Sequence, residues 1–110
     1  MTELIIYQSE DGLAQVQFRT MDGTVWLSQI EIADLFATTK QNVSLHVKNI
    51  LAERELAAEA TVKESLTVQV EGRRRVQRLT QLYSLPMILA VGLRVRSVRG
   101  TQFRQWATAH

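Results

Sequence analysis

The sequence contains no cysteine, which excludes a disulfide framework and cysteine-ligated zinc or iron–sulfur sites. Long apolar runs are also missing. The longest, residues 85–91, is far shorter than the roughly 20 residues that a membrane-spanning helix needs. The chain begins Met1-Thr2-Glu3, without the basic segment of a secretory signal peptide. We therefore expect a soluble, cytoplasmic protein that does not act at a membrane.

Patterns that support catalysis or cofactor binding are scarce. Of the two histidines, His46 and His110, His46 has no second histidine or carboxylate at helical spacing with which to form a metal site. Ser44 lies on a different helix face from His46, so the two are not a nucleophile–base pair. No glycine-rich phosphate-binding motif is present. We expect a protein without catalytic activity, metal or cofactor.

Acidic residues are nearly absent from the C-terminal part. Residues 65–110 contain eight arginines and one acid, Glu71, a net charge of +7, whereas residues 1–64 contain five bases and ten acids, a net charge of −5. Such asymmetry indicates a surface that faces an anion, and nucleic acid is the commonest candidate. The alternative is that the two parts pack together and their charges partly cancel.

The 110 residues, of which 45% are hydrophobic, are enough for one core. We expect a single domain over residues 1–110, the N-terminal part of a longer protein, because no helix-stop signal precedes the last residue. Two Asp-Gly pairs predict hairpin turns, at residues 11–12 and 22–23. Around them, three segments have the pattern of short antiparallel strands: residues 4–7, 14–19 and 24–27.

Two short helices follow these strands. Ser28 and Glu31 have the spacing of a capping box at the start of the first helix. The second is expected over residues 40–52, with Thr39 as its N-cap. Each helix has apolar residues at the spacing of one buried face: Ile32, Leu35 and Phe36 in the first, and Val43, Val47, Ile50 and Leu51 in the second. A break at residues 37–39 joins them, and two helices this short and this close form a helix–turn–helix unit.

In such units the second helix lies in the major groove, where its exposed residues contact base edges. On a helical wheel, the side chains facing away from the core are of types that bond bases or contact a thymine methyl. The predicted base-reading residues are Gln41, Asn42, Ser44, Leu45 and Lys48, and Thr39 and Lys40 are predicted phosphate contacts. The alternative is an ordinary helical hairpin with a polar solvent face.

A basic hairpin comes next, with strands over residues 62–70 and 73–83 and a turn at residues 71–72. Its tip and one arm carry the remaining predicted phosphate contacts, Arg73, Arg74, Arg75 and Arg78. A basic ribbon beside a helix–turn–helix is the arrangement of a winged-helix wing, which contacts phosphates or enters a minor groove. The alternative is a solvated hairpin whose charges prevent edge-to-edge aggregation.

Two helices are expected at the C-terminus. The first begins after Ser84, with Pro86 in its first turn, and the apolar residues 87–93 predict a helix buried on all sides. The last carries its apolar side chains on one face: Phe103, Trp106 and Ala107. Between the two helices lies a basic corner, Arg94, Arg96 and Arg99. This corner either binds an anion at a helix N-terminus or pairs with acids of the chain, such as Glu31, Asp34 or those of residues 53–64.

Three segments resemble the RhuM-like, virulence-associated family of bacterial proteins: residues 24–36 (TVWLSQIEIADLF), 43–50 (VSLHVKNI) and 90–108 (AVGLRVRSVRGTQFRQWAT). The last is the most specific. A fainter similarity extends to the N-terminal DNA-binding domains of phage antirepressor and Bro-type proteins. The resemblance implies a protein of pathogenicity islands or prophage-like regions.

The sequence departs from the family pattern at several positions. Ala37 stands where the family usually has glycine, so the turn is either wider or strained. Pro86 replaces a frequent aspartate and Leu93 an aromatic residue, and the arginines at residues 73–75 are individual to this chain.

We therefore predict an α+β domain with an N-terminal β-hairpin or meander, a helix–turn–helix, a wing-like basic hairpin and two C-terminal helices packed under it. The predicted function is non-catalytic binding of double-stranded DNA, as a regulator or targeting module of a virulence- or prophage-associated protein, with a homodimer as one possible state. The alternative is an antirepressor-like module that binds a repressor or another protein. Binding to DNA would weaken steeply with salt, whereas an apolar protein interface would not.

Overall fold

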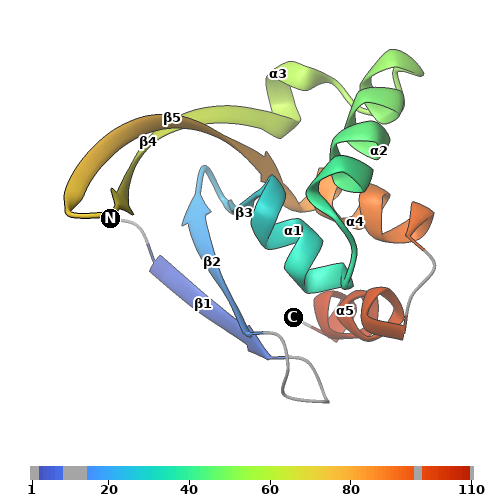
Figure 1. The fold of residues 1–110 in the computed structure, drawn as a ribbon. Helices are drawn as coiled ribbons and strands as arrows, with labels where there is room; N and C mark the ends of the chain where they lie inside the picture. The colour runs from blue at the N-terminus through green and yellow to red at the C-terminus, as the bar shows by residue number, and fades with distance from the viewer. Residues whose placement is uncertain (1–2, 9–14, 96–97, 110) are drawn as a thin grey trace.

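The computed structural model describes residues 3–8, 15–95 and 98–109, and it is an α+β domain built on one antiparallel sheet (Figure 1). This confirms the predicted fold class. The strands are β1 (Glu3–Gln8), β2 (Gln15–Met21), β3 (Thr24–Ser28), β4 (Val62–Glu71) and β5 (Arg74–Ser84). The helices are α1 (Gln29–Phe36), α2 (Lys40–Ala52), α3 (Ala58–Thr61), α4 (Leu85–Arg94) and α5 (Val98–Ala109).

The first three strands form the predicted meander. Asp22 and Gly23 connect β2 to β3 with φ angles of +54° and +77°, and a two-residue hairpin turn of type I′ requires positive φ at both positions. The other predicted turn, at residues 11–12, lies outside the described residues. The strand order is β1-β2-β3-β5-β4, so β3 also pairs with β5. This pairing joins the meander and the basic hairpin in one sheet, which the sequence analysis did not predict.

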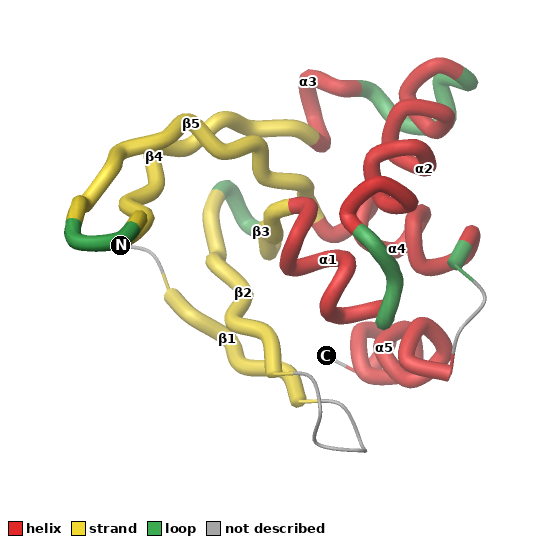
Figure 2. Tube along the Cα trace, in the orientation of Figure 1, coloured by secondary structure: helices red, strands yellow, loops and turns green. Residues whose placement is uncertain are grey.

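The core lies between one face of the sheet and the helices, which gather on one side of the molecule (Figure 2). One face of the sheet contributes side chains to this core: Tyr7, Val16, Phe18, Leu27 and Tyr83. Where β3 pairs with β5, the other face is buried as well, at Trp26, Leu82 and Ser84. The apolar residues expected to share one face of α1, and most of the stripe expected on α2, are buried as predicted: Ile32, Leu35 and Phe36 of α1, and Val43, Val47 and Ile50 of α2.

The two C-terminal helices are not both packed under the basic hairpin, as the sequence analysis expected. Helix α4 contacts β3, β5 and α2, whereas α5 contacts α1 and α4. Phe103 of α5 meets the first two strands, with ring centroids 5.5 Å from Tyr7 and 5.8 Å from Phe18. Trp106 stacks on Phe18 at 5.6 Å. Aromatic pairs of this kind add about 0.5–1.5 kcal/mol each beyond the area they bury, which favours this position for α5.

The prediction that α4 is buried on all sides is wrong. Met87 and Val91 are fully buried, but Leu93 is 64% exposed and Pro86 is also exposed. On this side of α4, Leu85, Leu89 and Leu93 border an open depression together with residues of α5, so α5 covers this side only in part. Ser84 occupies the N-cap position as predicted, although its buried Oγ makes no hydrogen bond to the described residues.

Gly92 of α4 leaves room for the ring of Phe36 at the end of α1. A Cβ at this position would lie 2.8 Å from Cζ of Phe36, and Phe36 is fully buried. Alanine favours a helix by about 1 kcal/mol over glycine, but overpacking a core typically costs about 1–3 kcal/mol. We expect Gly92→Ala to lower the free energy of unfolding by about 1 kcal/mol in urea titrations.

The double variant Gly92→Ala with Phe36→Leu separates the two effects. Removing the ring leaves room for the added methyl group. In the Phe36→Leu background, Gly92→Ala should therefore lower the free energy of unfolding by less than it does in the presence of Phe36. If the Gly92→Ala protein were as stable as the wild type, the close contact between Gly92 and the Phe36 ring would be contradicted.

Candidate nucleic-acid interface

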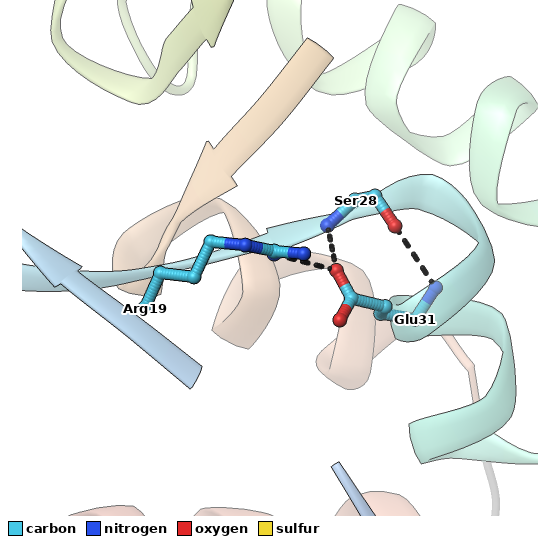
Figure 3. Close-up of polar contacts among 3 residues, drawn as sticks. All are labelled: Arg19, Ser28 and Glu31. Atoms are coloured by element: carbon cyan, nitrogen blue, oxygen red, sulfur yellow. Dashed lines mark hydrogen bonds and ion pairs between the residues drawn. The ribbon is translucent and has the colours of Figure 1, made fainter. Parts of the chain in front are cut away.

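Helix α1 begins at a capping box that is also tied to the sheet. The Ser28 Oγ accepts a hydrogen bond from the Glu31 N–H at 3.3 Å, and the Glu31 Oε1 accepts one from the Ser28 N–H at 2.9 Å (Figure 3). The predicted capping box is thus confirmed. The same Oε1 pairs with Nη1 of Arg19 on β2 at 2.9 Å. One carboxylate therefore caps the helix and attaches its first turn to the neighbouring strand.

The turn between α1 and α2, residues 37–39, contains a residue in the left-handed region. Ala37 has φ +56° and ψ +47°, and its N–H donates to the Asp34 carbonyl at 3.3 Å. A side chain in this region costs roughly 1–2 kcal/mol. The sequence left open whether the turn at Ala37 is wider or strained, and the structure has the strained turn.

The start of α2 is held by two polar contacts. Thr39 is the predicted N-cap, with its Oγ1 accepting from the Asn42 N–H at 3.1 Å. The Nδ2 of Asn42 donates to Oγ1 of Thr38 at 2.8 Å. Thr39 and Asn42, predicted to contact DNA, therefore both contribute to the cap. The Asn42 side chain is partly buried, which restricts its reach toward a ligand.

The other predicted base-reading residues share one exposed surface. Gln41, Ser44, Leu45 and Lys48 are all exposed, and together they line an open depression that also includes Lys40 and Gln29. Gln29 is the first residue of α1. A helical wheel of α2 contains no side chain from another helix, so the sequence pattern did not predict Gln29 at this surface.

A second depression adjoins the first and extends to the basic hairpin. Gln29 and Lys40 line both. On the far side of the second depression are residues 78–81 of β5. The structure thus brings two predicted phosphate contacts, Lys40 and Arg78, to the border of one depression. The sequence shows no sign of this proximity, because the two residues lie on elements that are joined only through the sheet.

The tip of the hairpin projects away from the helices (Figure 1). Glu71 pairs with Arg74, leaving Gly72 and Arg73 in the turn, and Gly72 has φ +61°, which glycine adopts without steric cost. Arg73, Arg74 and Arg75 are all exposed. Arg78 differs from them, because its Nε donates to Oε1 of Glu71 at 2.8 Å. Three of the four predicted arginines therefore form an exposed basic tip.

Two residues of the basic corner, Arg94 and Arg99, make contacts within the protein. Nη2 of Arg94 lies 3.0 Å from Oε2 of Glu53 and 3.4 Å from Oε2 of Glu55. Hydrogen bonding to Glu53 raises the pKa of the Arg94 guanidinium above its ordinary value. Arg99 donates from Nη1 to the Asp34 carbonyl at 3.1 Å, while Arg96 lies outside the described residues. The geometry supports the structural alternative for Arg94 and Arg99.

In the described ranges 3–8, 15–95 and 98–109, no group of three or more His, Cys, Asp or Glu side chains could hold a metal ion. Within the same ranges, none of the helices is long and apolar enough to cross a bilayer. His46 of α2 is partly buried.

The strained turn leads to a stability prediction. Replacing Ala37 with glycine removes a strain of roughly 1–2 kcal/mol and adds about 0.4–1 kcal/mol of unfolded-chain entropy. We expect Ala37→Gly to raise the free energy of unfolding by about 0.5–1 kcal/mol in chemical denaturation. The control is Ala52→Gly, at an exposed alanine in the last turn of α2, which should lower stability because glycine disfavours a helix. A loss of stability in Ala37→Gly would contradict the strain.

Comparison with known proteins supports the resemblance found in the sequence. Residues 60–110 match the profile of the Virulence protein RhuM family. Neither a curated protein nor a solved structure matches the chain. The match includes residues 90–108, the most specific segment of the resemblance, whereas residues 24–50 lie outside it and their resemblance stays a prediction. The segment from the end of α3 to α5 is therefore similar to this family.

Proposed function

We propose that the protein binds double-stranded DNA, with α1 and α2 as a helix–turn–helix and the β4–β5 hairpin as its wing. The observation that carries this proposal is the surface shared by α2 and β5. Two adjoining depressions meet at Gln29 and Lys40, with exposed residues of α2 on one side and Arg78 on the other. A duplex lying on this surface would contact a helix and a ribbon together.

Helix α2 has the properties of a recognition helix. It follows an eight-residue helix and a turn over residues 37–39, and an α-helix fits the major groove of B-DNA. Gln41 and Ser44 are exposed near its N-terminus, the part of a recognition helix that contacts base edges. Lys40 and Lys48 border the same depression and supply positive charge for phosphates.

The hairpin tip is suited to contacts with DNA phosphates, which do not depend on the base sequence. Arg73, Arg74 and Arg75 are exposed, and the guanidinium group has the fork geometry that matches phosphate oxygens. The neighbouring acid, Glu71, pairs with Arg78. In this proposal the tip contacts the backbone of the duplex on one side of the site that α2 reads.

The biological setting of the proposal rests on the family match. Because residues 60–110 are RhuM-like, we assign the domain to a regulator or targeting module of a virulence- or prophage-associated bacterial protein. The domain itself carries out no catalysis in this proposal.

A second function, binding of a repressor or another protein, is favoured by apolar side chains on the same surface. Leu45 borders one depression, and Ile30 and Leu79 border the other. They are 54%, 56% and 69% exposed, respectively. The two functions differ in salt dependence, because counterion release weakens DNA binding as salt rises.

The first test concerns the tip arginines. Each phosphate contact releases about 0.9 counterion equivalents, so replacing Arg73, Arg74 and Arg75 with serine should flatten the slope of log affinity against log salt by about two to three units. Affinity should fall equally on every sequence, since phosphate contacts carry no base information. Fluorescence anisotropy with labelled duplexes over a salt series measures both effects.

The control for this test is Arg54→Asn, which removes another exposed arginine, from the segment after α2. Asparagine tolerates the positive φ of +57° at that position. The control should keep the wild-type slope. A triple variant that also keeps the wild-type slope would contradict a wing that contacts phosphates.

The second test concerns base reading by α2. After a preferred duplex has been selected from a random pool, Gln41→Ala with Ser44→Ala should lower affinity for that duplex about tenfold or more, because each lost base contact costs about 1–3 kcal/mol. Affinity for random DNA should change little. Asn49→Ala, at an exposed position of α2 that borders neither depression, is the matched control. Equal losses on both duplexes would show that α2 does not read bases.

A further inference from the structure

The basic hairpin carries a strip of exposed apolar side chains. Leu66, Val68 and Val70 of β4 are 66%, 62% and 73% exposed, and Leu79 of β5 is 69% exposed. Leu66 lies directly opposite Leu79 in the register. The strip follows the same alternation as Val62, which packs against the core. It is therefore the core face of the sheet, continued beyond the helices that cover the rest of that face.

Strand β4 is also an edge of the sheet. It pairs with β5 along all ten of its residues, and the strand order gives it no neighbour on its other side among the described strands. Natural edge strands are protected by prolines, bulges or charges. The register of β4 is continuous from Val62 to Glu71, and the sequence between Glu64 and Glu71 contains neither proline nor charge. The charged residues of β4, Lys63, Glu64 and Glu71, lie at its two ends, so residues 65–70 carry none of the usual devices that prevent pairing with another strand.

We propose that β4 pairs antiparallel with β4 of a second copy of this chain, around a two-fold axis at Val68. Residues that lie opposite each other in an antiparallel pair share a face of the sheet. With the axis at this position, the Val68 residues of the two copies lie opposite each other, and Leu66 lies opposite the partner's Val70. Each exposed apolar residue of β4 then has an apolar neighbour, and the interface is the same patch on both copies, as two-fold symmetry requires.

Charge complementarity favours a second copy over an unrelated strand. Antiparallel pairing puts the tip of one hairpin beside the base of the other. The tip carries the exposed Arg73, and the base carries the exposed Glu64 and, on α3, the exposed Glu59. In the proposed register Glu64 lies opposite the partner's Gly72, next to the partner's Arg73. Lys63 lies opposite that arginine, but its Nζ is paired with Oδ2 of Asp22 at 2.7 Å. The acidic side chains at the base of one copy therefore lie beside the basic tip of the other, which favours the pairing of two copies.

The dimer would join two five-stranded sheets into one continuous sheet. Because the two-fold axis is perpendicular to that sheet, both copies keep their helices, including α2, on the same side. The proposal does not rest on DNA binding, and the experiments that test it contain no DNA. Failure of the dimer would leave the proposed function standing, and failure of DNA binding would leave the dimer standing.

The first experiment is sedimentation equilibrium over a concentration series. The wild type should dimerise with increasing concentration, and Val68→Lys should be monomeric because it places two lysines opposite each other at the axis. Leu79→Lys is the matched control. Its side chain is equally exposed on the same face but belongs to β5, which β4 separates from the proposed interface. The control should keep the dimer.

Two further variants test the register. Val68→Cys introduces a lone cysteine into a chain that has none. Opposite residues of an antiparallel pair have Cα atoms about 4.5–5.5 Å apart, within the roughly 4.4–6.8 Å that a disulfide spans. Oxidation should crosslink Val68→Cys into covalent dimers and Leu79→Cys far less. Glu64→Arg should weaken the dimer several-fold, and adding Arg73→Glu should restore it.

Several results would overturn the proposal. One is a wild type that stays monomeric at every concentration, and another is a Val68→Cys protein that forms no crosslink. Loss of the dimer in Leu79→Lys but not in Val68→Lys would indicate that the apolar faces of two hairpins pack against each other, without pairing of the β4 edges. A series of ever larger oligomers would indicate that β4 pairs with β1 of another copy. That pairing leaves a free edge at each end of the assembly, so further copies can add.

Discussion

The structure depends on a short pairing between β3 and β5. Three residue pairs join these strands, from Trp26–Ser84 to Ser28–Leu82. Between them, Leu27 lies opposite Tyr83, and both side chains are buried in the core. Burial also raises the pKa of the Tyr83 hydroxyl. Without this pairing the basic hairpin would be separate from the meander, and an isolated two-stranded hairpin is marginally stable at best.

The same pairing positions the helices, because each paired strand continues directly into one. Strand β3 ends at Ser28 and α1 begins at the next residue, while β5 ends at Ser84 and α4 begins at the next. The capping box at Ser28, worth about 1 kcal/mol in a typical helix, and the contact of Arg19 with Glu31 hold the entry into α1. The depressions beside α2 and the hairpin exist because these junctions lie side by side in the sheet.

The arginines of the C-terminal part serve two different purposes. Arg94 and Arg99 hold elements of the protein together, through Glu53, Glu55 and the Asp34 carbonyl. The arginines at residues 73–75 are exposed at the hairpin tip. The net charge of the segment does not distinguish these uses, because charge counts say nothing about which acids the fold brings near. The exposed tip is therefore a better indication of an anionic partner than the charge of the whole segment.

Local signals in the sequence were sufficient for several parts of the structure. Asp22-Gly23 indicated a turn that needs positive φ, Ser28 and Glu31 indicated a helix start, and the spacing of Val43 and Val47 indicated the buried side of α2. The wheel of α2 also selected most of the exposed residues that line one depression. Each of these features depends on residues a few positions apart, so the chain carries the information locally.

Other features were decided by the tertiary structure. The pairing of β3 with β5, the exposure of Leu93 and of the strip on β4, and the proximity of Lys40 to Arg78 depend on which distant segments meet. An alternating strand has the same sequence pattern whether or not a helix covers its apolar face. By itself, the sequence determined where the helices and turns begin and which side chains share a face. Only the packing of the sheet decided which of those faces are covered, because burial requires a second surface that local spacing does not specify.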